Sequence, residues 1–164
     1  MNTQPAHPKI DPIFERYTTP GSPGAAVGVM KNGAIVYRQG YGLANLEHQV
    51  PMTPSTIFNI GSISKQFTAF AIALLEAEGK LGLDDDMRQY LPEMHDFGET
   101  ITLRHLIHHT SGMRDTFPEL LALAEWRNGD ITLMQDAYWL LCNQRQLNFL
   151  PGEEFSYSNA NYVL

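Results

Sequence analysis

Apolar positions recur with two different spacings, and the change between them separates two parts of the chain. Residues 24–31 and 34–38 are β-type runs joined by Asn32-Gly33, a dipeptide that suits a type I′ turn, so they predict a β-hairpin. From Ser62 to Gly79 the apolar residues recur every three or four positions, which predicts a long and mostly buried helix. Strands are therefore expected near the start of the chain and helices in its middle.

Shorter elements are expected around these two. Proline directly after Asp11 predicts a short opening helix, and residues 43–56 predict a connecting loop because they hold two prolines and little periodicity. Short helices are expected at residues 86–90, 102–109 and 119–126, a longer helix at 132–143, and a helix-like run at 160–164. No internal repeat or long linker interrupts this order.

The predicted hairpin has no neighbouring strands in the sequence. A two-stranded hairpin cannot bury both of its faces and is marginal in water by itself. No second cluster of strand-like residues follows, and the last apolar run has no C-cap or breaker before Leu164. We therefore expect residues 1–164 to be the N-terminal part of a larger domain, whose remaining strands come from the same chain or from a second chain.

Composition and charge fit a water-soluble globular protein and exclude some classes of binding partner. The 164 residues are 43% hydrophobic and 18% charged, which excludes disorder and collagen. The formal net charge of -7 supplies no basic field for phosphate backbones, so no nucleic-acid partner is expected. The most apolar stretch, residues 67–75, is far shorter than the ~20 residues that cross a bilayer, so no membrane span is expected.

The N-terminus and the single cysteine leave the compartment open. Residues 1–5 lack the basic residues and apolar run of a secretory signal. As it stands the sequence fits a soluble, cytoplasmic protein, and it fits a periplasmic one if a signal has been removed. Cys142 cannot form an intrachain disulfide, and beside two leucines it is expected to be a buried apolar residue.

Ser62 and Lys65 form the first candidate site for chemistry. They lie three residues apart at the start of the long predicted helix, so their side chains share a face. A serine hydroxyl becomes a nucleophile when a neighbour accepts its proton, and a lysine within reach can do so. Gly61 leaves room for a substrate, and the backbone N–H groups at a helix start favour a developing oxyanion. Taken alone, the pattern favours the plainer interpretation of an N-capping serine followed by a surface lysine.

Tyr157 and Asn159 form the second candidate site. They follow a Pro151-Gly152 turn and precede the last helix-like run. A phenol and an amide two residues apart in a tight loop can converge on one point. Such a tyrosine could relay the serine proton when a neighbouring lysine lowers its pKa, and the amide could orient both the lysine and a substrate carbonyl. Taken alone, the pair also fits a packed tyrosine and a turn asparagine.

Four segments, in order, resemble the penicillin-recognising serine hydrolases, most closely their class C β-lactamase and D,D-carboxypeptidase branch. The segments are residues 58–68, which contain Ser62-Ile63-Ser64-Lys65, then 79–85, 101–112 and 151–159, which end in Tyr157-Ser158-Asn159. The similarity runs from about Asp11 to the last residue. It implies an α+β, β-lactamase/transpeptidase-like fold in which a helical domain packs against an antiparallel sheet flanked by helices.

The resemblance also implies a division of the chain and a role for each candidate residue. Residues 1–60 would supply the N-terminal helix, the hairpin and a connecting loop, and residues 61–164 the nucleophile helix and the helical subdomain. Ser62 resembles the acylated nucleophile, Lys65 its proton acceptor, Tyr157 the base that relays protons to the leaving group, and Asn159 the orienting amide. No cofactor is implied.

One motif of the family is missing from this sequence. Family members carry Lys or His, then Thr or Ser, then Gly on a later strand, which also gives an oxyanion N–H. Residues 109–112 imitate this motif in composition but lie at another position in the chain.

Taken together, the matching segments imply a serine hydrolase that forms an acyl-enzyme on β-lactam, D-alanyl peptide or small ester substrates. The alternative is a catalytically incomplete fragment, or a penicillin-binding or sensor relative without turnover.

Three further groups of residues have a competing functional interpretation. His105, His108 and His109 have spacings that could hold zinc on one helix, yet no Cys or carboxylate stands nearby as a third kind of ligand. Residues 84–86 are three aspartates without the alternation of an EF-hand, so an acidic helix N-terminus is favoured over calcium binding. Three aromatic residues are expected to be core rather than a ligand pocket, namely Trp126, Tyr138 and Trp139.

Overall fold

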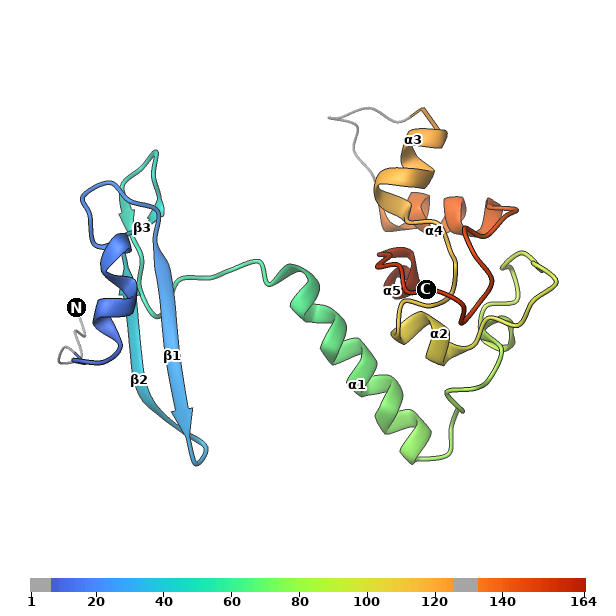
Figure 1. Cartoon of the computed structure of the whole chain (residues 1–164), viewed down its shortest axis with the longest axis horizontal. Helices are drawn as coiled ribbons and strands as arrows, with labels where there is room; N and C mark the ends of the chain where they lie inside the picture. Colours follow the sequence, from blue (N-terminus) through green and yellow to red (C-terminus); the bar gives the residue numbers. More distant parts are fainter. Residues whose placement is uncertain (1–6, 126–132) are drawn as a thin grey trace. The chain divides into compact units, whose positions relative to one another are not determined.

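Two units make up the chain in the computed structural model, an N-terminal unit of residues Met1–Asn59 and a C-terminal unit of residues Ile60–Leu164 (Figure 1). The structure describes residues 7–125 and 133–164. The N-terminal unit holds short antiparallel sheets, and the C-terminal unit is built of helices and loops. Helices and antiparallel strands are both present, as an α+β fold requires.

The predicted β-hairpin forms the centre of the N-terminal unit. Strands β1 (Ala25–Lys31) and β2 (Ala34–Tyr41) pair antiparallel, with Lys31 opposite Ala34. The two residues between them, Asn32 and Gly33, have φ angles of 51° and 77°. A type I′ turn needs positive φ at both central positions, so the turn predicted from Asn-Gly is confirmed.

The prediction of a plain loop over residues 43–56 is wrong. Strands β3 (Leu43–Asn45) and β4 (Val50–Pro51) pair antiparallel within it. Proline is tolerated at the end of an edge strand, where its missing N–H interrupts no ladder. Strands of three and two residues are too short to show an alternation of apolar and polar positions. The periodicity of the sequence therefore did not predict them.

A network around a half-buried carboxylate holds the opening helix against the hairpin. The helix η1 (Asp11–Tyr17) is a 3₁₀ helix, and the Tyr41 hydroxyl donates a 2.6 Å hydrogen bond to Asp11 Oδ1. The Tyr37 hydroxyl donates to the same oxygen, and the ring of Phe14 stacks on that of Tyr41 at 4.8 Å. Hydrogen bonds from Tyr37 and Tyr41 lower the pKa of Asp11, so its charged form sustains the network.

The C-terminal unit follows the predicted order of helices, several of them shorter than predicted. They are η2 (Gly61–Ile63), α1 (Ser64–Ala77), η3 (Met87–Gln89), α2 (Leu103–Ile107), η4 (Thr116–Leu120), α3 (Leu121–Leu123), α4 (Met134–Asn143) and α5 (Ala160–Val163). The ends of two predicted helices, at residues 126 and 132, lie outside the described residues. In the described ranges no helix combines the length and apolar character needed to cross a bilayer.

Methionine and branched aliphatic side chains fill the core of the C-terminal unit. Met87, Ile101 and Leu141 are its largest fully buried apolar side chains, and Leu106 and Ala160 pack with them. These residues come from η3, α2, α4 and α5 and from the segment before α2. The core therefore joins α5, which directly follows the Tyr-x-Asn loop, to the helices in the middle of the chain.

Helix α1 is present as predicted, but its predicted burial is wrong. Ile63, Phe67, Phe70 and Leu74 form a stripe along it and are between 49% and 63% exposed, and no residue of α1 is buried. An amphipathic face is buried only when another element covers it. Within the C-terminal unit none of the described elements covers this face, so the apolar spacing identified the helix and not its surroundings.

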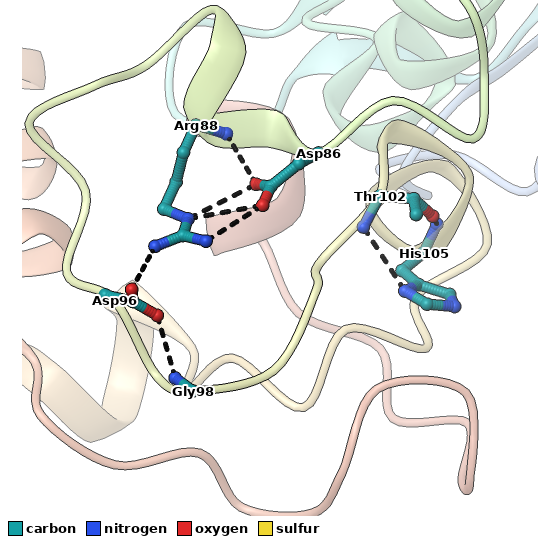
Figure 2. A network of polar contacts seen from close by, with 6 residues as sticks. All are labelled: Asp86, Arg88, Asp96, Gly98, Thr102 and His105. Carbon is teal, nitrogen blue, oxygen red and sulfur yellow. Dashed lines mark hydrogen bonds and ion pairs between the residues drawn. The ribbon is translucent and has the colours of Figure 1, made fainter.

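Of the three aspartates predicted to form an acidic helix start, Asp86 caps η3, whereas Asp84 pairs with Arg104 and Asp85 accepts from Gly82 N and Tyr90. Asp86 accepts a 2.9 Å hydrogen bond from the backbone N–H of Arg88 and pairs with the guanidinium of the same residue at 3.0 Å (Figure 2). Arg88 also pairs with Asp96 at 2.7 Å, and Asp96 accepts from the backbone N–H of Gly98. This network ties the first turn of η3 to the loop that leads toward α2.

The predictions for the aromatic residues and the cysteine have mixed outcomes. Trp139 is 63% exposed, so its assignment to the core is wrong. Tyr138 is half-buried and donates a hydrogen bond to Glu93, while Trp126 lies outside the described residues. Cys142 packs against the core without being fully buried. A helix on the surface of a unit turns one face, made of every third or fourth residue, toward the solvent. Trp139 lies on this solvent-exposed face of α4.

We expect Leu141→Ala to destabilise the C-terminal unit strongly. Leu141 is fully buried, so truncation removes apolar contacts and leaves a cavity that costs about 2–5 kcal/mol of the free energy of unfolding. The matched control is Leu123→Ala, because Leu123 is 68% exposed and should change stability by less than about 0.5 kcal/mol. Denaturant unfolding of both variants measures the difference, and equal stabilities would contradict the packing described.

Candidate active site

The structure brings all four candidate residues of the C-terminal unit to one point. Ser62 lies in η2, Lys65 in the first turn of α1, and Tyr157 and Asn159 in the loop before α5. The Ser62 Oγ atom lies 2.6 Å from the Tyr157 hydroxyl oxygen and 3.4 Å from Lys65 Nζ. Lys65 Nζ donates a 2.9 Å hydrogen bond to Asn159 Oδ1. Two segments more than ninety residues apart therefore share one polar cluster.

The cluster makes its tyrosine easier to ionise. Lys65, and next the hydrogen bond with Ser62, lower the pKa of Tyr157 below the ordinary value for a phenol. The Lys65 ammonium also lies 5.0 Å from the centre of the Tyr157 ring and 5.6 Å from that of Tyr162. A positive charge beside a phenol stabilises the phenolate, so Tyr157 is suited to accept a proton from the serine hydroxyl.

Within the C-terminal unit, the site is open to molecules from solution. The Ser62 side chain is exposed, and Tyr157 is 46% exposed. A cavity of about 480 Å³ borders the cluster and is lined by Gly61, Ser64, Lys65, Thr68, Asn159, Tyr162 and Val163. A nucleophile beside an open cavity can reach a carbonyl group of a bound molecule. The arrangement can therefore support acyl transfer to a serine.

A backbone scaffold formed by residues 109–112 holds the Tyr-x-Asn loop. Thr110 O accepts from Gly152 N at 2.8 Å, and Gly112 O accepts from Asn148 N at 2.7 Å. His109 O accepts from the N–H of residue 156 at 3.0 Å. Residues 109–112, which imitate the family's third motif in composition, thus have a structural role here. They pair with the loop that carries the candidate base.

Buried polar side chains complete this scaffold behind Tyr157. His109 is buried, and its ring lies 4.5 Å from that of Tyr157. Its Nδ1 atom accepts from the backbone N–H of Ser158 at 3.3 Å and from Asn161 Nδ2 at 3.2 Å. Ser111 donates a 2.5 Å hydrogen bond to Asn161 Oδ1. Burial, and then Lys65, lower the pKa of His109, so this ring packs behind the site as a neutral imidazole.

The three histidines considered as zinc ligands serve different contacts. His105 Nδ1 accepts from Thr102 N at 3.3 Å, while Thr102 Oγ1 accepts from His105 N at 3.2 Å (Figure 2). This reciprocal pair caps the start of α2. His109 faces the loop with Tyr157, and His108 is exposed. Over residues 7–125 and 133–164, no three His, Cys, Asp or Glu side chains are grouped so that they could hold a metal ion.

Sequence reasoning missed Asp115, which lies directly beside the cluster. Its two carboxylate oxygens accept hydrogen bonds from the backbone N–H of Asn159 at 2.9 Å and from Asn159 Nδ2 at 3.1 Å. Asp115 belongs to no motif in the sequence. Its position at the site depends on a contact with a residue 44 positions later, and no spacing rule for a helix or strand connects two such residues.

The chain is similar to penicillin-binding proteins and β-lactamases. The sequence model of the family described as Beta-lactamase matches residues 10–164. A penicillin-binding protein of Bacillus subtilis (strain 168) is 35% identical over 156 residues, which cover 94% of this chain and 33% of that protein. The chain spans about one third of the length of the curated relatives it matches.

Solved structures show the same similarity. An octameric penicillin-binding protein homologue from Pyrococcus abyssi has a TM-score of 0.70 and 34% identity, over 86% of this chain and 33% of that one. A class C β-lactamase, solved with cefoxitin, has a TM-score of 0.67 and 30% identity, over 93% and 39% of the two chains. The β-lactamase/transpeptidase-like fold that the resemblance implied is confirmed for this part of the domain.

We expect Tyr157 to ionise at a lower pH than the five tyrosines whose pKa is raised, namely Tyr37, Tyr41, Tyr90, Tyr138 and Tyr162. NMR titration of tyrosine ring carbons should show one signal with a midpoint below about 10, the ordinary value, and Tyr157→Phe should remove it. In Lys65→Met the midpoint should move upward, because the main cause of the lowered pKa is lost. An unchanged midpoint in that variant would contradict the electrostatics described.

We expect Gly112→Ala to disrupt the loop scaffold. Gly112 has a φ of +74°, and a Cβ atom there would lie 2.0 Å from Phe149 O. Gly98→Ala is the matched control, because Gly98 has a φ of +79° and open space at its Cβ. Both variants carry a backbone strain of about 1–2 kcal/mol, and the clash should cost Gly112→Ala about 1–3 kcal/mol more. Thermal unfolding measures both, and equal losses would refute the close approach.

Proposed function

Because this chain belongs to the beta-lactamase family, whose members are generally serine hydrolases, we propose that it forms an acyl-enzyme on Ser62. The substrate class is an amide or ester of the β-lactam, D-alanyl peptide or small-ester kind. The proposal rests above all on the 2.6 Å contact between the Ser62 hydroxyl and Tyr157, whose pKa is lowered. It needs no cofactor.

In the proposed acylation step, the Ser62 oxygen attacks the substrate carbonyl carbon while its proton passes to the Tyr157 phenolate. The C–O bond forms, and the carbonyl oxygen becomes an oxyanion. When this intermediate collapses, the bond to the amine or alcohol leaving group breaks, and Tyr157 returns the proton to that group. The products are the free amine or alcohol and an ester of Ser62, which water hydrolyses to the acid.

The distances favour Tyr157 over Lys65 as the direct proton acceptor. The Tyr157 hydroxyl lies 2.6 Å from Ser62 Oγ, whereas Lys65 Nζ makes a longer hydrogen bond to the same atom, at 3.4 Å. We assign Lys65 the electrostatic role, because a nearby ammonium stabilises the phenolate before the step and the charge that develops during it. Asn159 holds this ammonium through Oδ1 and could also bind a substrate carbonyl with its amide group.

A second function remains open within the same chemistry, namely acylation without efficient turnover. The observation that favours it is the exposure of the site, since Ser62 and Tyr157 both face solvent. Deacylation requires a positioned water molecule and a stabilised oxyanion. A protein that retains its acyl group for hours acts as a penicillin binder or sensor, and one that loses it within seconds acts as a hydrolase. The lifetime of the adduct distinguishes the two.

The test is intact-mass spectrometry of the chain after exposure to a penicillin and, separately, to a nitrophenyl ester. We expect an adduct on the natural chain, because the cluster supplies a nucleophile with a base in contact. Ser62→Ala should abolish the adduct.

Ser55→Ala is the matched control, since Ser55 is also an exposed serine and lies outside both the cluster and its cavity. It should be labelled like the natural chain. Equal labelling of Ser62→Ala and Ser55→Ala would refute the proposed function.

A further inference from the structure

The Asp115 carboxylate accepts two hydrogen bonds from a single residue of the site, Asn159. Asp115 lies three residues after Gly112 in the segment that precedes η4, and its carboxylate is half-buried. One oxygen accepts from the backbone N–H of Asn159 and the other from the side-chain Nδ2 of the same residue. The carboxylate therefore fixes both the main chain and the side chain of Asn159.

The chemistry of the three groups allows only one orientation of the Asn159 amide. An ionised carboxylate only accepts hydrogen bonds, and a lysine ammonium only donates them. Asn159 lies between the two, so its NH₂ group must face Asp115 and its oxygen must face Lys65. The observed contacts follow this pattern, at 3.1 Å to Asp115 and 2.9 Å to Lys65 Nζ. Without the carboxylate, only the Lys65 ammonium would hold the amide in this orientation, and the backbone N–H and the NH₂ group of Asn159 would lose their common acceptor.

We propose that Asp115 is a positioning residue that orients the Asn159 amide and thereby holds the Lys65 ammonium beside Ser62 and Tyr157. Asp115 makes no hydrogen bond to the nucleophile or the base, and its hydrogen bonds in the cluster go to Asn159. Its negative charge opposes the lowering of the pKa of Tyr157, as the smallest of the causes that act on that group. This inference rests on the proposed function for its effect on acylation. Its structural part, the orientation of the amide, stands independently of that function.

Replacing the carboxylate by an amide tests this role with little change in shape. An asparagine at position 115 has one accepting oxygen for two donors, so its own NH₂ group must oppose one of the N–H groups of Asn159. We expect Asp115→Asn to slow the acylation of Ser62 by about 10- to 100-fold, the range expected when a catalytic group is displaced by a fraction of an ångström to one ångström.

A control variant separates this effect from the loss of a carboxylate as such. Asp136 accepts a 2.9 Å hydrogen bond from the backbone N–H of Leu133 at the start of α4, in the same unit and outside the candidate cluster. Asp136→Asn makes the same change of charge, and its remaining oxygen can still accept from the Leu133 N–H. It should leave the acylation rate of Ser62 at the natural value.

A reciprocal exchange gives a sharper test. In Asn159→Asp two carboxylates oppose each other, which should also slow acylation. In the double variant Asp115→Asn/Asn159→Asp, the new amide at 115 accepts from the backbone N–H of residue 159 and donates to its carboxylate. The second oxygen of that carboxylate remains for Lys65. Every hydrogen bond has a partner again and the net charge is unchanged, so the double variant should be acylated faster than Asn159→Asp alone.

A readout independent of activity is the ¹⁵N NMR signal of the Asn159 side-chain NH₂ group. In the natural chain its protons should exchange slowly with water and be shifted by the carboxylate. Asp115→Asn should change both properties, and Asp136→Asn should change neither.

The outcomes separate the two proposals. Altered NH₂ signals and slowed labelling in Asp115→Asn, with recovery in the double variant, support the inference. Unchanged NH₂ signals, or natural labelling rates in Asp115→Asn, overturn it. If the natural chain is not labelled at all, the proposed function fails, and the NH₂ signals alone decide the role of Asp115. If Asp115→Asn does not fold, the comparison of the double variant with Asn159→Asp decides, and no gain in the double variant overturns the inference.

Discussion

The candidate site depends on one contact, the hydrogen bond from Lys65 at the start of α1 to Asn159 in the loop before α5. An ammonium donates only, so it needs acceptors wherever it is placed. Asn159 supplies one, and the position that results brings the positive charge near the ring of Tyr157 and the oxygen of Ser62. The lowered pKa of Tyr157 follows from this placement. A serine, a phenol and an amide without this charge would be three ordinary polar residues.

The helical unit is organised so that the loop bearing Tyr157 and Asn159 has little freedom. Residues 109–112 pair with it through backbone hydrogen bonds, and His109 supports it from behind. Gly112 permits the close approach because it has no Cβ atom. The core residue Ala160 follows the loop directly and is fully buried, so packing fixes its other end. Local backbone pairing and core packing thus act together on the short segment that carries the chemistry.

The sequence predicted those features that depend on neighbouring residues. The Asn32-Gly33 turn and helix α1 are local, and their patterns were sufficient to predict them. The clustering of Ser62 and Lys65 with Tyr157 was expected from the order of motifs and the resemblance they carry, and not from spacing alone. The exposure of Phe67 and Trp139, and the contact of Asp115 with Asn159, could not be predicted. Each depends on which distant part of the chain packs against the residue. The spacing of apolar and polar residues within one segment carries no information about that.

The central claim is that Ser62 and Tyr157 meet, although 95 positions separate them in the chain. Nuclear Overhauser measurements on the 164-residue chain test it directly, with selective labels on the serine β protons and the tyrosine ring protons. We predict a cross-peak between the Ser62 β protons and the Tyr157 ring protons, and this cross-peak should be absent in Tyr157→Ala. A folded chain with no cross-peak between these two residues would contradict the account.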